Sequence, residues 1–186
     1  MTSHPNRRGL IQLGLIAAAA GALPAAATAA EAPRDFDFLH GSWRVRHRRL
    51  KVRLANNHDW QEFDGTCVCQ PMMGGFGNVD DNWLDLPGDP YRAIGMRAYD
   101  PTTRQWAIWW VDGRTPHGRV DPPVKGGFKE GVGTFLTEDV QVGRKVIVRF
   151  EWSKITPRTA VWEQAFSLDG GKTWELNWHM DFTRTA

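Results

Sequence analysis

The sequence predicts an all-β fold, a single antiparallel β-barrel of about nine strands that follows a cleaved signal peptide. Beyond residue 30, apolar and polar residues alternate in short stretches, which glycine, proline, asparagine and aspartate separate. Almost no segment there has the 3.6-residue period of an amphipathic helix. All ten tryptophans of the chain also lie beyond residue 30. Alternating strands that carry many large rings favour one closed wall around an aromatic interior.

Residues 1–30 have the pattern of a targeting segment. The basic pair Arg7 and Arg8 precedes an apolar stretch from Leu10 to Leu23, and a tract of small residues with A-x-A cleavage sites follows Pro24. The apolar stretch has about 14 residues, whereas a membrane-spanning helix needs about 20. We therefore expect removal of this segment and no integral membrane segment.

The paired arginines favour one export route. The segment Asn6-Arg7-Arg8-Gly9-Leu10-Ile11-Gln12 resembles the twin-arginine consensus, and the apolar stretch is rich in glycine and alanine rather than leucine. The alternative is a general secretory signal in which the two arginines are adjacent by chance. On either route the expected division is a signal peptide over 1–30 and a barrel domain over 31–186, in a periplasmic or secreted protein.

Charge excludes one class of partner. The signal holds two of the 23 basic residues and none of the 21 acidic residues, so the remaining chain is balanced. A balanced surface does not attract nucleic acid or anionic membrane, and we expect neither as a partner. One basic stripe alternates along the first strand, and we interpret it as a solvated strand face. Its members are Arg44, Arg46, Arg48, Arg49, Lys51 and Arg53.

The two cysteines do not predict a metal centre. Cys67 and Cys69 are two residues apart on an expected strand, so their side chains share one face. Neighbours at this spacing are poorly placed for a disulfide, and two thiols without further ligands make a poor zinc site. We interpret them as small buried hydrophobic residues, with a redox role as the alternative, and expect no metal and no cofactor.

The expected strands are short and separated by turns. They lie near residues 42–53, 60–69, 78–85, 91–99, 105–112, 132–138, 144–153, 158–168 and 174–183. A single helical turn over Asp35–Leu39 is expected before the first strand. The segment from Gly113 to Gly127 lacks alternation and contains Pro122-Pro123. It is either a lid or mouth of the barrel or a solvated connector stiffened by proline.

The last three strands have one apolar and one polar face, which predicts an inward apolar side. The apolar faces consist of Val146, Val148, Phe150 and Trp152; of Trp162, Phe166 and Leu168; and of Leu176, Trp178, Met180 and Phe182. A barrel of this size either fills its interior with side chains or leaves room for one small ligand. Because aromatic walls with a few polar groups suit a flat or hydrophobic molecule, the expected partner is a small hydrophobic or aromatic molecule.

Alternation also selects candidate ligand-binding residues. Those expected to face inward are Trp43, His47, Asp81, Trp83, Trp110, Trp162, Gln164 and Trp178. His47 is the candidate catalytic residue, because a buried histidine near Asp81 or Asp112 can act as a general base. The alternative is a hydrogen-bonded structural histidine, with the aspartates at strand ends.

One segment carries a family resemblance. FDFLHGSWRV (36–45) has a Gly-x-Trp at the start of the first strand, after an apolar turn, and this is typical of calycin barrels, in which the tryptophan closes the end of the barrel. The chain resembles an uncharacterised calycin-like family of bacterial proteins of unknown function. The resemblance is carried further by GT (65–66), GGFGNVDDN (74–82), YDPTTRQWAIWWVDGR (99–114), DPPVKGGFKEGVGTF (121–135) and RTAVWEQAFSLDGGKTWELNWHMDFTR (158–184). It implies a lipocalin-like barrel and no known catalytic residues.

Three functions are compatible with these observations. The first is an exported barrel that binds a small hydrophobic or aromatic molecule. The second is an isomerase, lyase or hydrolase that uses the same pocket with His47 as acid–base. The third follows from the nitrobindins, which have a similar Gly-x-Trp and a haem-ligating histidine near the C-terminus, roughly where His179 lies. Strand parity places His179 beside Glu175 and Asp181, away from the apolar face, which argues against haem. A single Asp-box pattern at 167–174 marks a hairpin and implies no glycosidase.

Overall fold

The computed structural model describes residues 31–118 and 120–185. The expected signal peptide over 1–30 lies outside the described residues and stays a prediction. Within the described ranges, no helix has the length and hydropathy needed to cross a membrane.

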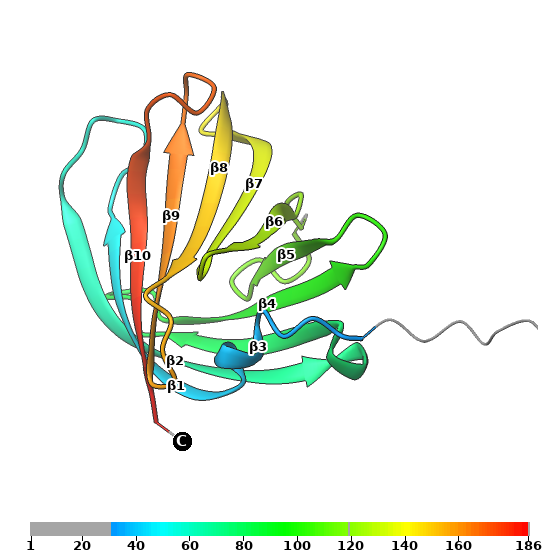
Figure 1. The fold of residues 1–186 in the computed structure, drawn as a ribbon. Coiled ribbons are helices and arrows are strands. Elements are labelled where there is room, and N and C mark those ends of the chain that lie inside the picture. Colours follow the sequence, from blue (N-terminus) through cyan, green and yellow to red (C-terminus); the bar gives the residue numbers. More distant parts are fainter. Residues whose placement is uncertain (1–30, 119, 186) are drawn as a thin grey trace, which may run out of the picture.

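The described residues form ten antiparallel strands that close into one barrel (Figure 1). The strands are β1 (Gly41–Leu50), β2 (Trp60–Met72), β3 (Gly77–Leu84), β4 (Tyr91–Asp100), β5 (Gln105–Asp112), β6 (Val124–Lys129), β7 (Val132–Gln141), β8 (Arg144–Ser153), β9 (Thr159–Ser167) and β10 (Glu175–Arg184). Consecutive strands are neighbours all the way round, and β1 pairs with β10 to close the wall. The predicted all-β barrel is confirmed.

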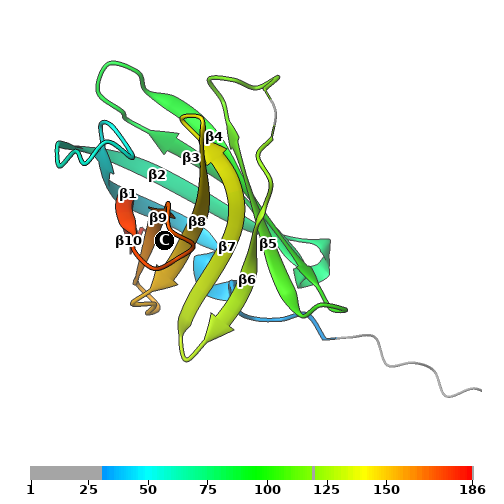
Figure 2. The ribbon, with the colours of Figure 1, turned by 90° about the horizontal axis from the view of Figure 1, so that it is seen from above.

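Strand β6 is the difference from the expected nine strands. It begins at Val124, inside the segment from Gly113 to Gly127 for which no strand is expected, and extends to Lys129. It pairs with β5 only from Trp106↔Gly126 to Ile108↔Val124. The strand lacks an alternating pattern because it contains glycine where β7 approaches closely. A Cβ at Gly126 would lie 1.9 Å from the Thr134 carbonyl oxygen, so this position requires glycine. Figure 2 shows β6 between β5 and β7 in the wall of the barrel.

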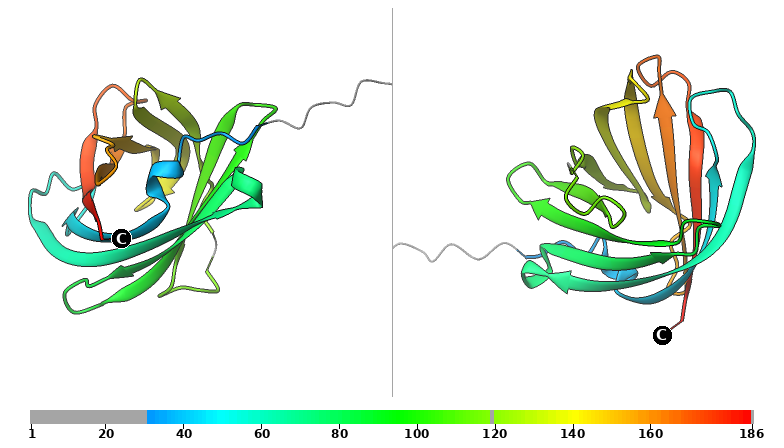
Figure 3. Two further views of the ribbon diagram at one scale, coloured as in Figure 1. Left: turned by 60° about the horizontal axis from the view of Figure 1, so that its bottom comes forward. Right: turned by 180° about the vertical axis from the view of Figure 1, so that it is seen from behind.

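The segment before β1 lies across one end of the barrel and forms its base (Figure 3), where the rings of Phe36, Phe38 and Trp152 pack together. The expected helical turn is a short 3₁₀ helix, η1 (Asp37–Leu39), and Trp43 Nε1 donates to the Leu39 carbonyl at 2.7 Å. The Arg184 guanidinium lies 4.2 Å from the Trp43 ring centroid and donates to the carbonyls of Phe38 and His40. Trp43 is therefore part of the base, as the calycin resemblance implies.

Strand β10 departs from its expected parity at one point. The register against β9 shifts between Leu176 and Trp178, which marks a β-bulge. The bulge places Asn177 and Trp178 inside in succession, whereas Leu176 is 37% exposed. The prediction that Leu176 faces inward and Asn177 outward is wrong, because the extra residue reverses the alternation before Trp178. On β8, the inward set of Val146, Val148, Phe150 and Trp152 holds as expected.

Candidate ligand-binding cavity

A cavity of about 210 Å³ opens at the end of the barrel opposite η1. Its mouth is formed where β1, β5 and β7 end and where β4 and β10 begin. Asp121 and Pro122, from the connection between β5 and β6, line the same mouth. The segment was expected to be either a mouth of the barrel or a solvated connector, and the position of these two residues favours the mouth.

Three tryptophans form the aromatic wall of the cavity. The Trp178 ring meets Trp110 and Trp162 edge to face, with centroids 5.9 and 5.6 Å apart. Phe150 meets Trp162 in the same way at 4.8 Å. Rings held at right angles present both faces and edges to the space between them, which suits a flat apolar molecule.

His47 holds the Trp178 ring in place from behind. Trp178 Nε1 donates to His47 Nδ1 at 3.2 Å, and the imidazole stacks on Phe63 at 4.6 Å with 7° between the planes. Burial, with the charges of Arg49 and Arg46, lowers the pKa of His47 to about 3. The imidazole is thus a neutral acceptor, and Gly65 leaves the room that its Nε2 occupies.

The bulge adds a polar group to the wall. Gln164 lines the cavity, and its Nε2 donates to Asn177 Oδ1 at 2.7 Å. Asn177 is 0% exposed and points inward because of the bulge. The Gln164 amide is therefore held by a buried partner, as orientation of a bound molecule requires.

Arginines lie around the mouth. Arg49 from β1 and Arg53 from the following loop both stack on Trp178, with guanidinium carbons 5.2 and 5.8 Å from the ring centroid. Burial and the charge of Arg49 lower the pKa of Arg53 to about 10. Arg114 instead binds both Asp112 oxygens, at 3.0 and 2.6 Å, and Asp89 at 2.8 Å. The Arg114 charge is neutralised, whereas Arg49 and Arg53 have no carboxylate within 4.0 Å among the described residues.

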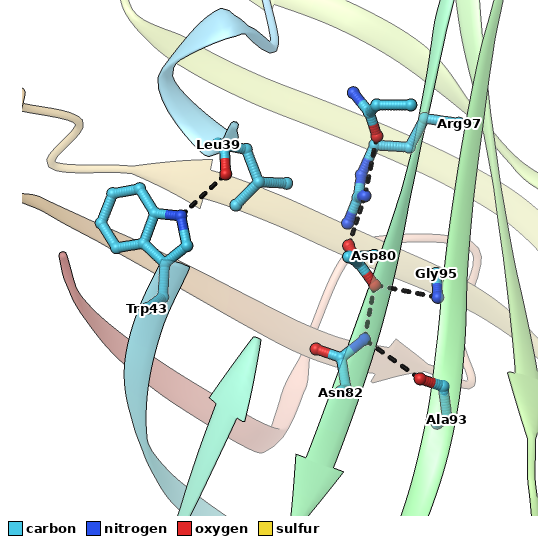
Figure 4. A network of polar contacts seen from close by, with 8 residues as sticks. Leu39, Trp43, Asp80, Asn82, Ala93, Gly95 and Arg97 are labelled. Carbon is cyan, nitrogen blue, oxygen red and sulfur yellow. Dashed lines mark hydrogen bonds and ion pairs between the residues drawn. The ribbon is translucent and has the colours of Figure 1, made fainter. Parts of the chain in front are cut away.

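A buried ion pair lies deeper in the barrel (Figure 4). Arg97 Nη1 contacts Asp80 Oδ2 at 2.5 Å and donates to Asn78 Oδ1 at 3.0 Å. The other Asp80 oxygen accepts from the Gly95 amide at 2.9 Å and from Asn82. A void of about 30 Å³ separates this network from Trp110 and Trp162. The network fixes the floor beneath the aromatic wall.

The two thiols are packed beside this network. Cys67 and Cys69 are free and buried on the inner face of β2, as expected for small hydrophobic residues. Burial raises the pKa of Cys67 well above its usual value and that of Cys69 to about 12. Neither thiol is activated, so the redox alternative receives no support from the geometry.

Four of the eight predicted site residues line the cavity: Trp110, Trp162, Gln164 and Trp178. Trp43 lies in the base, and His47 lies behind Trp178, so neither lines it. The prediction that Asp81 and Trp83 face inward is wrong. Asp81 pairs with Arg92 at 2.7 Å on the outer surface, and Arg92 also stacks on Trp83. The inward residues of β3 are instead the polar neighbours Asn78, Asp80 and Asn82, and Arg97 on β4 makes their burial possible.

The sequence interpretation missed the two free arginines. The stripe was interpreted as a solvated face, and this holds for Arg44, Arg46 and Arg48, whereas Arg49 and Arg53 turn toward the cavity. Alternation along β1 predicts the inward direction of Arg49, since Arg49 shares a face with His47. Arg53 lies beyond the end of β1, where no periodicity predicts its direction.

The remaining candidates do not meet His47. Asp112 lines the cavity and is bound by Arg114, and Asp81 is outside, so no carboxylate contacts the imidazole among the described residues. His179 lies on the outer wall, with Nδ1 2.8 Å from Glu163 and Nε2 3.2 Å from Asp181. This position does not fit a haem ligand inside the barrel. No described group of three or more histidine, cysteine, aspartate or glutamate side chains is arranged to hold a metal ion.

Comparisons with known proteins agree with the barrel. A redesigned β-barrel is similar at 13% identity with a TM-score of 0.46, over 82% of this chain and 96% of that chain. An S-type phycobiliprotein lyase from Guillardia theta is similar at 11% identity with a TM-score of 0.53, over 81% of this chain and 90% of that chain. At such identity the likeness to the lyase shows the fold alone. No curated protein matches the chain.

One family matches the first part of the barrel. The match covers residues 34–120, from the turn before β1 to the connection after β5. It includes the Gly-x-Trp segment on which the sequence resemblance was based, and the expected resemblance to an uncharacterised family is confirmed. Over this range the chain is similar to the family described as "Protein of unknown function (DUF1579)".

Proposed function

We propose that the protein is an exported carrier or sensor that binds one small aromatic or hydrophobic molecule inside its barrel. The observation that supports this most directly is the cavity of about 210 Å³ whose lining includes Trp110, Trp162 and Trp178. Ligand pockets usually have volumes of roughly 300–1,000 Å³. This cavity is smaller than that range and therefore suits a small molecule.

Preorganisation of the cavity is compatible with binding. Trp178 is fixed by His47, and Gln164 is fixed by Asn177. Side chains held in this way lose little conformational entropy when a ligand binds.

Native mass spectrometry of protein purified from its own export route tests this function. The wild-type protein is expected to carry a co-purified organic molecule. Trp162→Leu removes a cavity ring, and the matched control Trp83→Leu removes a ring on the outer face. We expect the first variant to lose most of the bound mass and the second to keep it. Wild-type protein with no bound mass, or equal retention by both variants, would contradict the proposal.

Export is a separate part of the proposal and has its own test. N-terminal sequencing of the protein recovered from the periplasm or medium is expected to begin near residue 31, after the A-x-A tract. A twin-lysine variant, with Arg7→Lys and Arg8→Lys, is expected to stay inside the cell with its first 30 residues intact. Unchanged export of this variant would support the general secretory route instead.

A further inference from the structure

We propose that the bound molecule is an anion, a carboxylate on an aromatic or conjugated body, and that Arg49 and Arg53 bind the acid group. This inference rests on the proposed function and names the ligand class. Both guanidinium groups lie over Trp178, with carbons 5.2 and 5.8 Å from its ring centroid. A carboxylate between them therefore lies beside the space that the three tryptophans enclose.

In the part of the chain that the structure describes, neither arginine forms an ion pair. Among the described residues, no carboxylate lies within 4.0 Å of either group, and the closest polar contact of Arg49 is the Tyr91 hydroxyl at 3.4 Å. Other arginines do have partners: Arg97 pairs with Asp80 and Arg114 with Asp112 and Asp89, while the half-buried Arg184 donates to backbone carbonyls. Two like charges side by side in a cavity repel each other, and an anion relieves that repulsion.

The loop that carries Arg53 is built to hold it there. The Leu54 amide donates to both oxygens of the Glu175 carboxylate, at 2.9 and 3.0 Å. The Leu54 carbonyl accepts from Arg144 Nη1 at 3.2 Å. Leu54 also has a positive φ of 58°, a backbone conformation that needs such support. These contacts fold the connection between β1 and β2 back over the mouth and point Arg53 inward.

Three of the four acidic groups near the mouth accept hydrogen bonds from the protein. Glu175 accepts from Leu54, and Asp112 is bound by Arg114. Asp139 accepts from the Val140 amide at 2.7 Å and from Gln141 Nε2 at 2.6 Å. Asp121 is exposed at the rim. None of these acids lies within 4.0 Å of either guanidinium group among the described residues, which leaves both groups able to bind a ligand.

Pairs of ligands that differ only in charge separate the contribution of the acid group to binding from that of the aromatic ring. We would titrate the full mature protein with benzoate, 2-naphthoate and 9-anthroate, and with the corresponding amides, following tryptophan fluorescence and calorimetry. The expected result is that a carboxylate binds roughly 10- to 100-fold more tightly than its amide, the range for a charge-assisted hydrogen bond. Increasing salt is expected to weaken the binding of the carboxylate and to leave the binding of the amide unchanged.

Variants assign the effect to the two side chains. Arg49→Gln and Arg53→Gln are each expected to remove most of the preference for the carboxylate. Arg44→Gln, on the exposed face of β1, is the matched control and is expected to keep it. Because the two charges repel each other, the cavity variants are expected to unfold at the same or a higher temperature than the wild type. A purely structural role would instead lower that temperature.

The outcomes separate this inference from the proposed function. Equal binding of acids and amides overturns the anion inference and leaves the cavity function standing. Preserved carboxylate preference in both arginine variants also overturns it. If no acid or amide in the series binds and the natively exported protein carries no molecule, the proposed function fails as well.

Discussion

The Trp178 indole donates its Nε1 hydrogen to His47 Nδ1 at 3.2 Å, a contact between β10 and β1 that fixes one wall of the cavity. The histidine that the sequence offered as a general base is instead a buried acceptor. It lies flat on Phe63 and above the bare backbone of Gly65. Its chemistry is that of a positioning residue.

The lowered pKa of His47 predicts acid sensitivity. In the unfolded chain the histidine takes up a proton near pH 6.5, whereas the folded protein excludes it until about pH 3. The unfolded state therefore binds more protons in this window, and stability falls as the pH is lowered from 6.5 toward 3. The loss reaches about 4 kcal/mol at the lower end. Urea unfolding of wild type and His47→Gln between pH 7 and pH 4 measures it. The variant is expected to have a shallower pH dependence, and identical slopes would contradict this role.

The bare backbone at Gly65 predicts a second effect. A Cβ there would lie 2.4 Å from the Trp83 carbonyl oxygen and 2.7 Å from His47 Nε2. Gly65→Ala is therefore expected to cost about 1–3 kcal/mol of unfolding free energy and to weaken ligand binding through the displaced ring. Gly127→Ala is the control, since its Cβ meets no atom within 4 Å. Equal stability of the two variants would show that β1 and β2 tolerate the added methyl.

The buried ion pair predicts a large single-site effect. Arg97→Met leaves the Asp80 carboxylate buried without its cation and is expected to cost about 3–5 kcal/mol, measured by chemical unfolding. The double variant Asp80→Asn with Arg97→Met removes both charges and is expected to recover part of that loss. A double variant that loses the sum of both single losses would mean that the two groups do not interact.

The burial of the two thiols predicts slow alkylation. At a pKa of about 12, Cys69 has about a thousandfold less thiolate at neutral pH than an ordinary thiol. In the folded protein both cysteines are expected to resist iodoacetamide and to react only as fast as the barrel unfolds. Rapid alkylation of either thiol without loss of structure would contradict the packing of β2.

The sequence predicted the period-two walls but not the points at which the period breaks. Val148 and Trp152 on β8 and His47 on β1 face inward as alternation requires. The bulge at Asn177 adds a residue that shifts the alternation, and Gly126 lacks the side chain on which alternation is recognised. Neither feature is therefore predicted from the sequence. These features depend on which strands lie side by side.

The polar interior of β3 was missed for a related reason. Alternation predicts an inward Trp83, yet Arg92 covers the ring on the outside. Asp80 is buried because Arg97, seventeen residues later in the sequence, lies on the neighbouring strand β4 and neutralises its charge. Burial of a charge depends on a partner that only the folded register reveals.

The central claim is that a ligand occupies the space between Trp110, Trp162 and Trp178. A two-dimensional ¹⁵N–¹H spectrum of the indole groups during titration with 2-naphthoate tests it most directly. The signals of these three tryptophans are expected to shift together, while those of Trp43 in the base and Trp83 on the outer face stay in place. Shifts confined to Trp83, or no shift at any indole with saturating probe, would contradict the account.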